Sequence, residues 1–200
     1  MKQVVVASNN PGKLRELGAM LAALGIEAMP QSPLGVGEAE EPHETFLENA
    51  LAKARHASRI TGQPALADDS GLCVTALRGA PGVHSAYYAG SEGRRAERDA
   101  RNNAKLVSAL REIPHRGAYY YCVLVLVRSA ADPAPLVADG EWHGEIVLQP
   151  RGENGFGYDP YFLVDGSRTA AELSADEKNR VSHRARALTA LAERLKRAMG

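Results

Sequence analysis

A nearly unbroken apolar and aromatic run, Tyr119 to Val127, limits the fold of this chain more than any other stretch. Strands covered on both faces read as continuous hydrophobic runs, whereas strands with one wet face alternate with polar residues. The run therefore predicts a central strand with other elements packed on both of its faces. The 200 residues, 44% of them hydrophobic, are enough for a single domain with a substantial core.

Further strands and helices are predicted on both sides of this run. The predicted strands are residues 4–7, 26–29, 64–67, 136–138 and 142–148. The predicted helices are residues 11–24, 45–61 and 102–113, a segment that starts at 174, and a last segment through 188–195. Asp139-Gly140 is expected to separate two antiparallel strands. The sheet should therefore be mixed and the fold class α/β.

The connecting segments carry turn residues and charges. Gly25 follows the first predicted helix as a stop signal, and Thr45 with Glu48 has the spacing of a capping box at the start of the second. Residues 79–85 predict a turn or a mobile loop. Residues 92–101 are strongly charged and are interpreted as a solvated face.

Residues 64–72 hold two adjacent carboxylates, Asp68 and Asp69, between an apolar run and Ser70-Gly71. We expect the strand to end here. Because successive side chains of an extended segment point to opposite faces, one carboxylate can serve a site as metal ligand or base while the other faces its support. Asp, Ser and Gly are also common turn residues, so this stretch alone is equally compatible with a simple chain reversal.

Residues 8–13, Ser-Asn-Asn-Pro-Gly-Lys, join the first predicted strand to the first predicted helix. Asn10 can cap the helix with Pro11 at its first position, which turns backbone N–H groups and the positive end of the dipole toward an anion. Lys13 adds a full charge. The segment lacks the first glycine and the Ser/Thr of a Walker motif, and a plain strand-to-helix turn remains the alternative.

Lys53 is a charged residue on the apolar side of the helix predicted at 45–61. On a helical wheel it falls on the apolar side, between Phe46 and Ile60. A desolvated ammonium is costly unless it meets an anion or extends to the edge of the apolar surface. We therefore expect Lys53 to have an anionic partner, with Asn49 one turn earlier on the same edge.

Residues 151–160 are rich in glycine and contain Phe156. An aromatic ring in such a loop can offer a face to a nucleobase, and the alternative is a tight loop with Phe156 buried in the core. Further along, the charged residues at 178–184 precede the apolar stripe of the last helix. From spacing alone we interpret them as exposed surface.

Composition excludes some classes of function. The 24 basic and 24 acidic side chains cancel, so no overall field favours nucleic acid or a membrane surface. The N-terminus has no secretory signal pattern, and a cytoplasmic location is expected. Cys73 and Cys122 lie in apolar runs and are expected to be buried thiols.

The local cations are Lys13, Lys53, Lys178 and Arg184, and the carboxylates that could join them are Glu40, Glu41 and Asp69. Together they suit a polyphosphate bound with Mg²⁺ and attacked by water.

The chain resembles the inosine triphosphate pyrophosphatase family in its bacterial form. The resemblance rests on six segments in the same order, at residues 8–13, 45–50, 67–72, 79–82, 155–160 and 177–184. It implies an elongated single domain over residues 1–200, with a central mixed twisted β-sheet and two lobes flanking a substrate cleft. It also implies a homodimer and Mg²⁺-dependent cleavage of ITP, dITP and XTP to nucleoside monophosphate and pyrophosphate.

The resemblance also implies residue roles. Asp69 would be the proton acceptor or an Mg²⁺ ligand, supported by Asp68 and Lys53, with Glu40 or Glu41 completing the metal site. The implied substrate-binding residues are Ser8, Asn9, Asn10, Pro11, Gly12, Lys13, Ser70, Phe156, Gly157, Tyr158, Asp159, Lys178, His183 and Arg184. One departure is Tyr87, which stands where the family pattern predicts an arginine, so a phosphate contact from that segment is left open.

Two other functions fit the same residue types. A less selective nucleotide phosphatase would release nucleoside diphosphate and orthophosphate instead of pyrophosphate. A nucleotide-binding regulatory module would bind without turnover, although the carboxylates at 68 and 69 would not help it to bind a polyanion without metal. Analysis of the products separates these alternatives.

Overall fold

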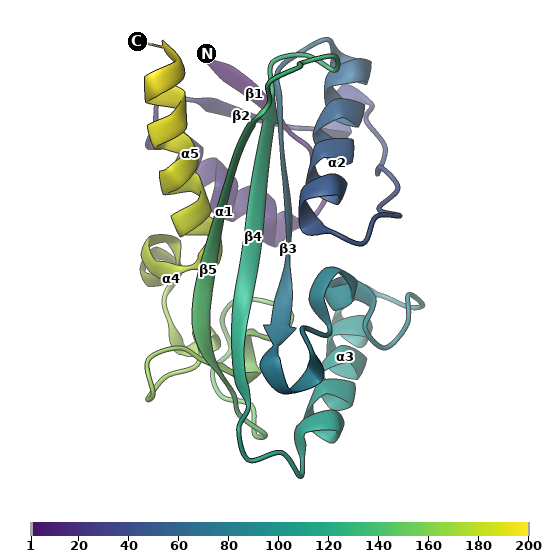
Figure 1. Cartoon of the computed structure of the whole chain (residues 1–200), viewed down its shortest axis with the longest axis vertical. Coiled ribbons are helices and arrows are strands. Elements are labelled where there is room, and N and C mark those ends of the chain that lie inside the picture. Colours follow the sequence, from purple (N-terminus) through teal and green to yellow (C-terminus); the bar gives the residue numbers. More distant parts are fainter. Residues whose placement is uncertain (1, 200) are drawn as a thin grey trace. The chain divides into compact units, whose positions relative to one another are not determined.

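The fold combines one mixed sheet with five α-helices in the computed structural model, which describes residues 2–199 (Figure 1). The strands are β1 (Gln3–Val6), β2 (Glu27–Pro30), β3 (Ala65–Val74), β4 (Gly117–Val127), β5 (Leu136–Ile146) and β6 (Phe162–Leu163). The helices are α1 (Pro11–Ala22), α2 (Phe46–Thr61), α3 (Arg95–Leu110), α4 (Ala175–Val181) and α5 (His183–Met199). Within the described residues the sheet order is β2-β1-β3-β4-β5-β6. β1 is parallel to β2 and β3, and β5 is antiparallel to β6, which confirms the predicted α/β class with a mixed sheet.

The chain forms two compact units. Unit 1 consists of residues 1–69, 122–140 and 183–200, and unit 2 of residues 70–121 and 141–182. Three of the boundaries fall inside β3, β4 and β5. Unit 1 has a core that includes Val4, Leu17, Leu124 and Leu191. Unit 2 has its own core, which includes Leu72, Leu106, Trp142 and Phe162.

The strand β4 is buried on both faces, as predicted, over only part of its length. Cys122 to Val127 are all buried, in agreement with a strand between two layers. In the first half of the strand the pattern alternates, with Tyr119 and Tyr121 half-buried between buried neighbours. Aromatic rings with one polar end tolerate such partly wet positions, which is why composition alone did not reveal the change.

Two predicted strand breaks are wrong. β3 continues through Ser70-Gly71 to Val74 as the neighbour of β4 in the sheet, whereas its pairing with β1 is at Ala65 and Leu66. β5 continues through Asp139-Gly140. Gly140 serves close packing instead of a turn, since a Cβ there would lie 2.5 Å from the carbonyl oxygen of His183 and 2.6 Å from the amide nitrogen of Ala187.

The helix limits follow the capping signals. Thr45 caps α2, its Oγ1 accepting from the backbone N–H of Glu48, and α2 ends before Gly62. α3 begins at Arg95, well before the predicted start at 102, because the carboxylate of Glu97 accepts a hydrogen bond from the backbone N–H of Arg94 and closes the first turn. The charged stretch at 92–101 is therefore partly helical.

The remaining predictions concern small features. Residues 82–87 form a short 3₁₀-helix, and the Ser85 hydroxyl accepts from the N–H of Leu72, so this segment of unit 2 is tied to β3. Cys73 and Cys122 are free and buried, as predicted, and burial raises the pKa of the Cys122 thiol to about 12. None of the helices in the described part of the chain is long and apolar enough to cross a membrane.

Candidate active site

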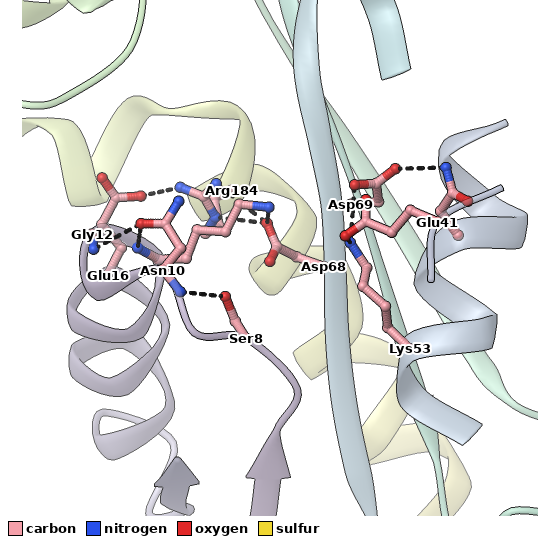
Figure 2. Close-up of polar contacts among 11 residues, drawn as sticks. Ser8, Asn10, Gly12, Glu16, Glu41, Lys53, Asp68, Asp69 and Arg184 are labelled. Carbon is pink, nitrogen blue, oxygen red and sulfur yellow. Dashed lines mark hydrogen bonds and ion pairs between the residues drawn. The ribbon is translucent and has the colours of Figure 1, made fainter. Parts of the chain in front are cut away.

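The adjacent carboxylates of β3 point to opposite faces of the strand, as the alternation of an extended chain requires (Figure 2). Asp68 lies on the side of α1 and Arg184, whereas Asp69 lies on the side of α2 with Lys53 and Glu41. Both residues are buried. β3 therefore builds two separate charge clusters in unit 1 from neighbouring residues.

The Asp68 cluster joins the start of α1 to the start of α5. Lys13 Nζ lies 3.1 Å from Asp68 Oδ2, and the guanidinium of Arg184 donates to the same oxygen at 3.3 Å. Arg184 also forms an ion pair with Glu16 of α1. Because Arg184 is only 1% exposed, its charge is neutralised entirely inside the protein.

The start of α1 is capped as predicted, but its backbone donors are not all available. Asn10 Oδ1 accepts from the backbone N–H of Gly12 at 2.9 Å and of Lys13 at 3.3 Å. Ser8 Oγ accepts from the N–H of Asn10, and Asn9 Oδ1 accepts from Ser32 Oγ and from Gln31 Nε2. An anion at this helix end would therefore replace the side chain of Asn10 as the acceptor.

The Asp69 cluster centres on the ammonium of Lys53. Lys53 Nζ lies 3.0 Å from Asp69 Oδ1 and 3.1 Å from Glu41 Oε1, so the predicted anionic partner of Lys53 is confirmed as a pair of carboxylates. Asn49 donates to Asp69 Oδ2 at the long distance of 3.5 Å and is held by the backbone of His43. Glu41 is exposed, so this cluster opens to solvent at one side.

The two clusters shift the pKa values of their carboxyl groups in opposite directions. Burial alone would raise the pKa of Asp68, but the charges of Lys13 and Arg184 outweigh burial and hold it well below the usual range. Burial raises the pKa of Asp69, and the opposing charges of Lys53 and Lys13 do not cancel the shift. Asp68 is thus a permanent anion, whereas Asp69 is the better proton acceptor.

The metal-binding potential of this face depends on two carboxylates. Within residues 2–199, no three His, Cys, Asp or Glu side chains are grouped so that they could hold a metal ion by themselves. Mg²⁺ in nucleotide sites takes one or two carboxylates and completes its shell with phosphate oxygens and water. Asp69 and Glu41 meet at Lys53 and supply such a pair, so the donor set fits Mg²⁺ bound with a polyphosphate. Glu40 is exposed, and it is Glu41 that forms the ion pair with Lys53.

A third cluster lies in unit 2. Lys178 Nζ donates to Asp159 Oδ2 at 2.7 Å, and the same oxygen accepts from the backbone N–H of Phe156 at 2.8 Å. The ammonium of Lys178 also lies 4.8 Å from the centre of the Phe156 ring. A Cβ at Gly155 would lie 2.1 Å from Asp159 Oδ2, so only glycine permits this loop.

The structure around this cluster contradicts two interpretations made from the sequence, one of Phe156 and one of the charged residues at 178–184. Phe156 is half-buried and is not among the buried core residues of the described chain, so the alternative of a core residue is wrong. The interpretation of the charges at 178–184 as exposed surface is also wrong, since Lys178, His183 and Arg184 are all buried. Spacing along a helix could not reveal the acids that lie opposite Lys178 and Arg184.

Other predicted substrate-binding residues have structural partners. Tyr158 is buried in the core of unit 2 and its hydroxyl donates to the carbonyl oxygen of Ser85. Gly157 has φ +64° and its carbonyl accepts from Asn103. Ser70 is half-buried in β3. The backbone of Gly157 and the hydroxyl of Ser70 remain candidates for ligand contact. Tyr158 instead supports the packing of unit 2.

The model of the Ham1 family matches residues 4–194, nearly the full length of the chain. The chain belongs to the Ham1 family. A relative from Burkholderia pseudomallei (strain K96243), named dITP/XTP pyrophosphatase, is 64% identical over 194 residues, which are 96% of this chain and 93% of the relative. The relative of the same name from Ralstonia nicotianae (strain ATCC BAA-1114 / GMI1000) is 61% identical over 197 residues, 98% of each chain. The resemblance read from the six sequence segments is thereby confirmed.

A solved Ham1 structure supports the fold. The HAM1 protein from Coxiella burnetii has a TM-score of 0.88 and 47% sequence identity, and the match covers 98% of this chain and 100% of that one. The α/β architecture with a mixed sheet is therefore that of Ham1 proteins.

Sequence reasoning missed several residues of α3 in this Ham1 chain. The guanidinium of Arg95 lies 4.8 Å from the centre of the Phe156 ring, and Asp99 and Asn103 bind the backbone of Gly157. The three residues recur at four-residue spacing, a signal that was hidden because the helix was predicted to begin at 102. Beside Tyr87, where the family pattern predicts arginine, Arg98 of the same helix places its guanidinium 5.4 Å from the ring centre.

Proposed function

We propose that this protein hydrolyses dITP, XTP and ITP to the nucleoside monophosphate and pyrophosphate, with Mg²⁺ bound by Asp69 and Glu41. The observation that carries the proposal is the Asp69 cluster, in which a buried carboxylate of raised pKa shares one ammonium with an exposed glutamate. Such a cluster can exchange its internal ion pairs for a metal ion and phosphate oxygens.

The class of enzyme rests on the relatives. Curated proteins more than 60% identical over nearly the whole chain are named dITP/XTP pyrophosphatase, so this chain is a nucleoside triphosphate pyrophosphatase, a hydrolase. Within that class, the metal and the substrates of this particular protein are our proposal. The proposal extends to a single domain of residues 1–200 that acts as a homodimer in the cytoplasm.

In the proposed reaction a water molecule attacks the α-phosphorus. The water oxygen forms the new bond to phosphorus, the bridging oxygen between the α- and β-phosphates leaves with pyrophosphate, and Asp69 accepts the proton of the attacking water. Bound Mg²⁺ would neutralise phosphate charge and polarise the bond that breaks. Lys53 would transfer its contact from the carboxylates to a phosphate oxygen, and Lys13 would add positive charge near the chain of phosphates.

Selectivity for the base would depend on oxygen O6. Hypoxanthine and xanthine present an acceptor at this position, where adenine presents a 6-amino donor. A protein donor that pairs with O6 is left unpaired by ATP, which costs about 1–3 kcal/mol and corresponds to roughly one to two decades in kcat/KM. Arg184 already binds Asp68 and Glu16. Lys178, which binds Asp159 but also lies beside the Phe156 ring, or a backbone N–H of the loop at 155–158 is therefore proposed as the donor.

Pyrophosphate release across dITP, XTP, ITP, GTP and ATP, with Mg²⁺ and with a chelator, tests the proposal. We expect pyrophosphate from the first three substrates and little from ATP, and no turnover without a divalent cation. Release of orthophosphate and nucleoside diphosphate would instead identify a phosphatase. Binding of dITP without any release would identify a regulatory module.

A further inference from the structure

A stripe of three polar residues on α3 faces the loop that carries Phe156. Arg95, Asp99 and Asn103 are four residues apart, so they lie along one face of the helix. Asp99 Oδ2 accepts from the backbone N–H of Gly157 at 3.3 Å, and Asn103 Nδ2 donates to the carbonyl of Gly157 at 3.0 Å. These two bonds fix the loop to the helix, so Phe156 is presented at a defined place beside Arg95.

Two cations contact the ring of Phe156, and they are held very differently. Lys178 is buried and bonded to Asp159 at 2.7 Å, so it has little freedom to move. The side chain of Arg95 is 38% exposed, and its ion pair with Asp99 is long, at 3.7 Å. Of the two groups, Arg95 is the one that can leave the ring without exposing a buried charge.

A purine base that stacks on Phe156 has to take over a ring face. A cation over a partly exposed ring is held weakly compared with a stacked base. The guanidinium of arginine is planar, so it can lie flat on an aromatic base as well as on phenylalanine, which the ammonium of lysine cannot do. Arg95 can therefore change its partner from the ring to the base.

We propose that Arg95 is a movable cover for the base site, which lies on Phe156 in the free protein and closes over the outer face of the purine in the complex. The base is then held between Phe156 and Arg95, while Asp99 and Asn103 keep the loop in place. The inference rests on the proposed function in one respect, since it takes Phe156 as the surface on which the base stacks.

Steady-state kinetics of Arg95→Ala with dITP test the proposal. Loss of one stacking partner of the base should raise KM about tenfold. We expect kcat to change less than about twofold, because Arg95 does not act on the reacting phosphate. Inhibition by pyrophosphate, which has no base, should stay unchanged. Arg95→Lys should resemble Arg95→Ala, because it keeps the charge and loses the plane.

The matched control is Arg94→Ala, which removes the same charge one residue earlier from a side chain that is 92% exposed. It should keep the KM of the wild type. Calorimetric binding of inosine monophosphate gives a second readout that needs no turnover, and Arg95→Ala should weaken this binding by the same factor. Thermal unfolding verifies that each variant is folded.

Several results would overturn the role of Arg95. A KM for dITP in Arg95→Ala equal to that of the wild type would show that Arg95 does not hold the base, and a lower KM would show that the side chain merely obstructs the ring. Full rescue by Arg95→Lys, or an equal loss of pyrophosphate inhibition, would show that only its charge matters. These outcomes differ from failure of the proposed function, in which the wild-type protein itself releases no pyrophosphate from dITP.

Discussion

The two faces of β3 carry the same side chain in opposite surroundings. Asp68 lies between Lys13 and Arg184, its side chain fully buried and its pKa lowered. Asp69, the next residue, shares Lys53 with a glutamate that is exposed, and its pKa is raised. The difference arises from the elements packed on each face and not from the strand itself.

Of the two carboxylates, Asp69 is the one that can react. The charge of Asp68 is balanced by two cations that come from helices α1 and α5, so any change of this charge disturbs the packing of unit 1. The partners of Asp69 can be exchanged for ligands, because Glu41 opens the cluster to water. We therefore assign a stabilising role to Asp68 and a chemical role to Asp69.

The largest expected effect is the loss of stability in Asp68→Asn. Removal of the charge takes away the buried carboxylate that Lys13 and Arg184 share, and Arg184 keeps Glu16. Breaking a buried pair in this way costs about 3–5 kcal/mol. Urea unfolding at neutral pH measures the loss. A change below about 1 kcal/mol, the typical value of a surface pair, would show that Asp68 does not have the stabilising role that separates it from Asp69.

Asp69→Asn should have the reverse pattern. Its kcat/KM for dITP should fall at least about a hundredfold, since the proton acceptor is lost while the shape of the side chain is kept. Its unfolding free energy should fall less than that of Asp68→Asn, because Lys53 retains Glu41. Near-normal pyrophosphate release by the folded variant would refute the assignment of Asp69.

Glu41→Gln and Glu40→Gln form a matched pair. Glu41 shares Lys53 with Asp69, so its neutralisation should raise the Mg²⁺ concentration for half-maximal activity by about tenfold. Glu40→Gln should leave it nearly unchanged. A Mg²⁺ titration of both variants measures the effect, and a larger shift for Glu40→Gln would move the metal site to that residue.

The smallest effect is expected in the pH dependence of stability. A carboxyl group whose pKa is lowered by folding contributes stability above its unfolded pKa, and this contribution is lost as the pH falls toward the folded value. The difference in unfolding free energy between wild type and Asp68→Asn should therefore stay constant from about pH 8 to about pH 5, and should narrow below about pH 4. A difference that already narrows between neutral pH and pH 5 would mean that Asp68 is not held as an anion.

Local signals made much of the fold predictable. The caps at Asn10 and Thr45 and the stop at Gly25 are interactions within a few residues, and the structure has them where the sequence predicts them. Because Lys53 lies on the apolar face of α2, the sequence predicted that it needs an anionic partner. The carboxylate of Asp69 is that partner. Alternation along a strand predicted the opposite directions of Asp68 and Asp69.

What was missed depends on partners far away in the sequence. The burial of Arg184 requires Asp68, which is 116 residues earlier, and the glycine at 140 is explained only by the approach of α5. Ser70-Gly71 has the composition of a turn, and its extended conformation inside β3 depends on the rest of the sheet, which the local sequence does not show. Arg95 was hidden for a similar reason, because its partner Phe156 comes from another part of the chain.

In the proposed mechanism a water molecule activated beside Asp69 attacks the α-phosphorus. A single turnover of dITP in water labelled with heavy oxygen tests it most directly, with mass spectrometry of both products. We expect the label to appear in the nucleoside monophosphate and the pyrophosphate to be unlabelled. Label in the pyrophosphate, or release of labelled orthophosphate, would contradict it.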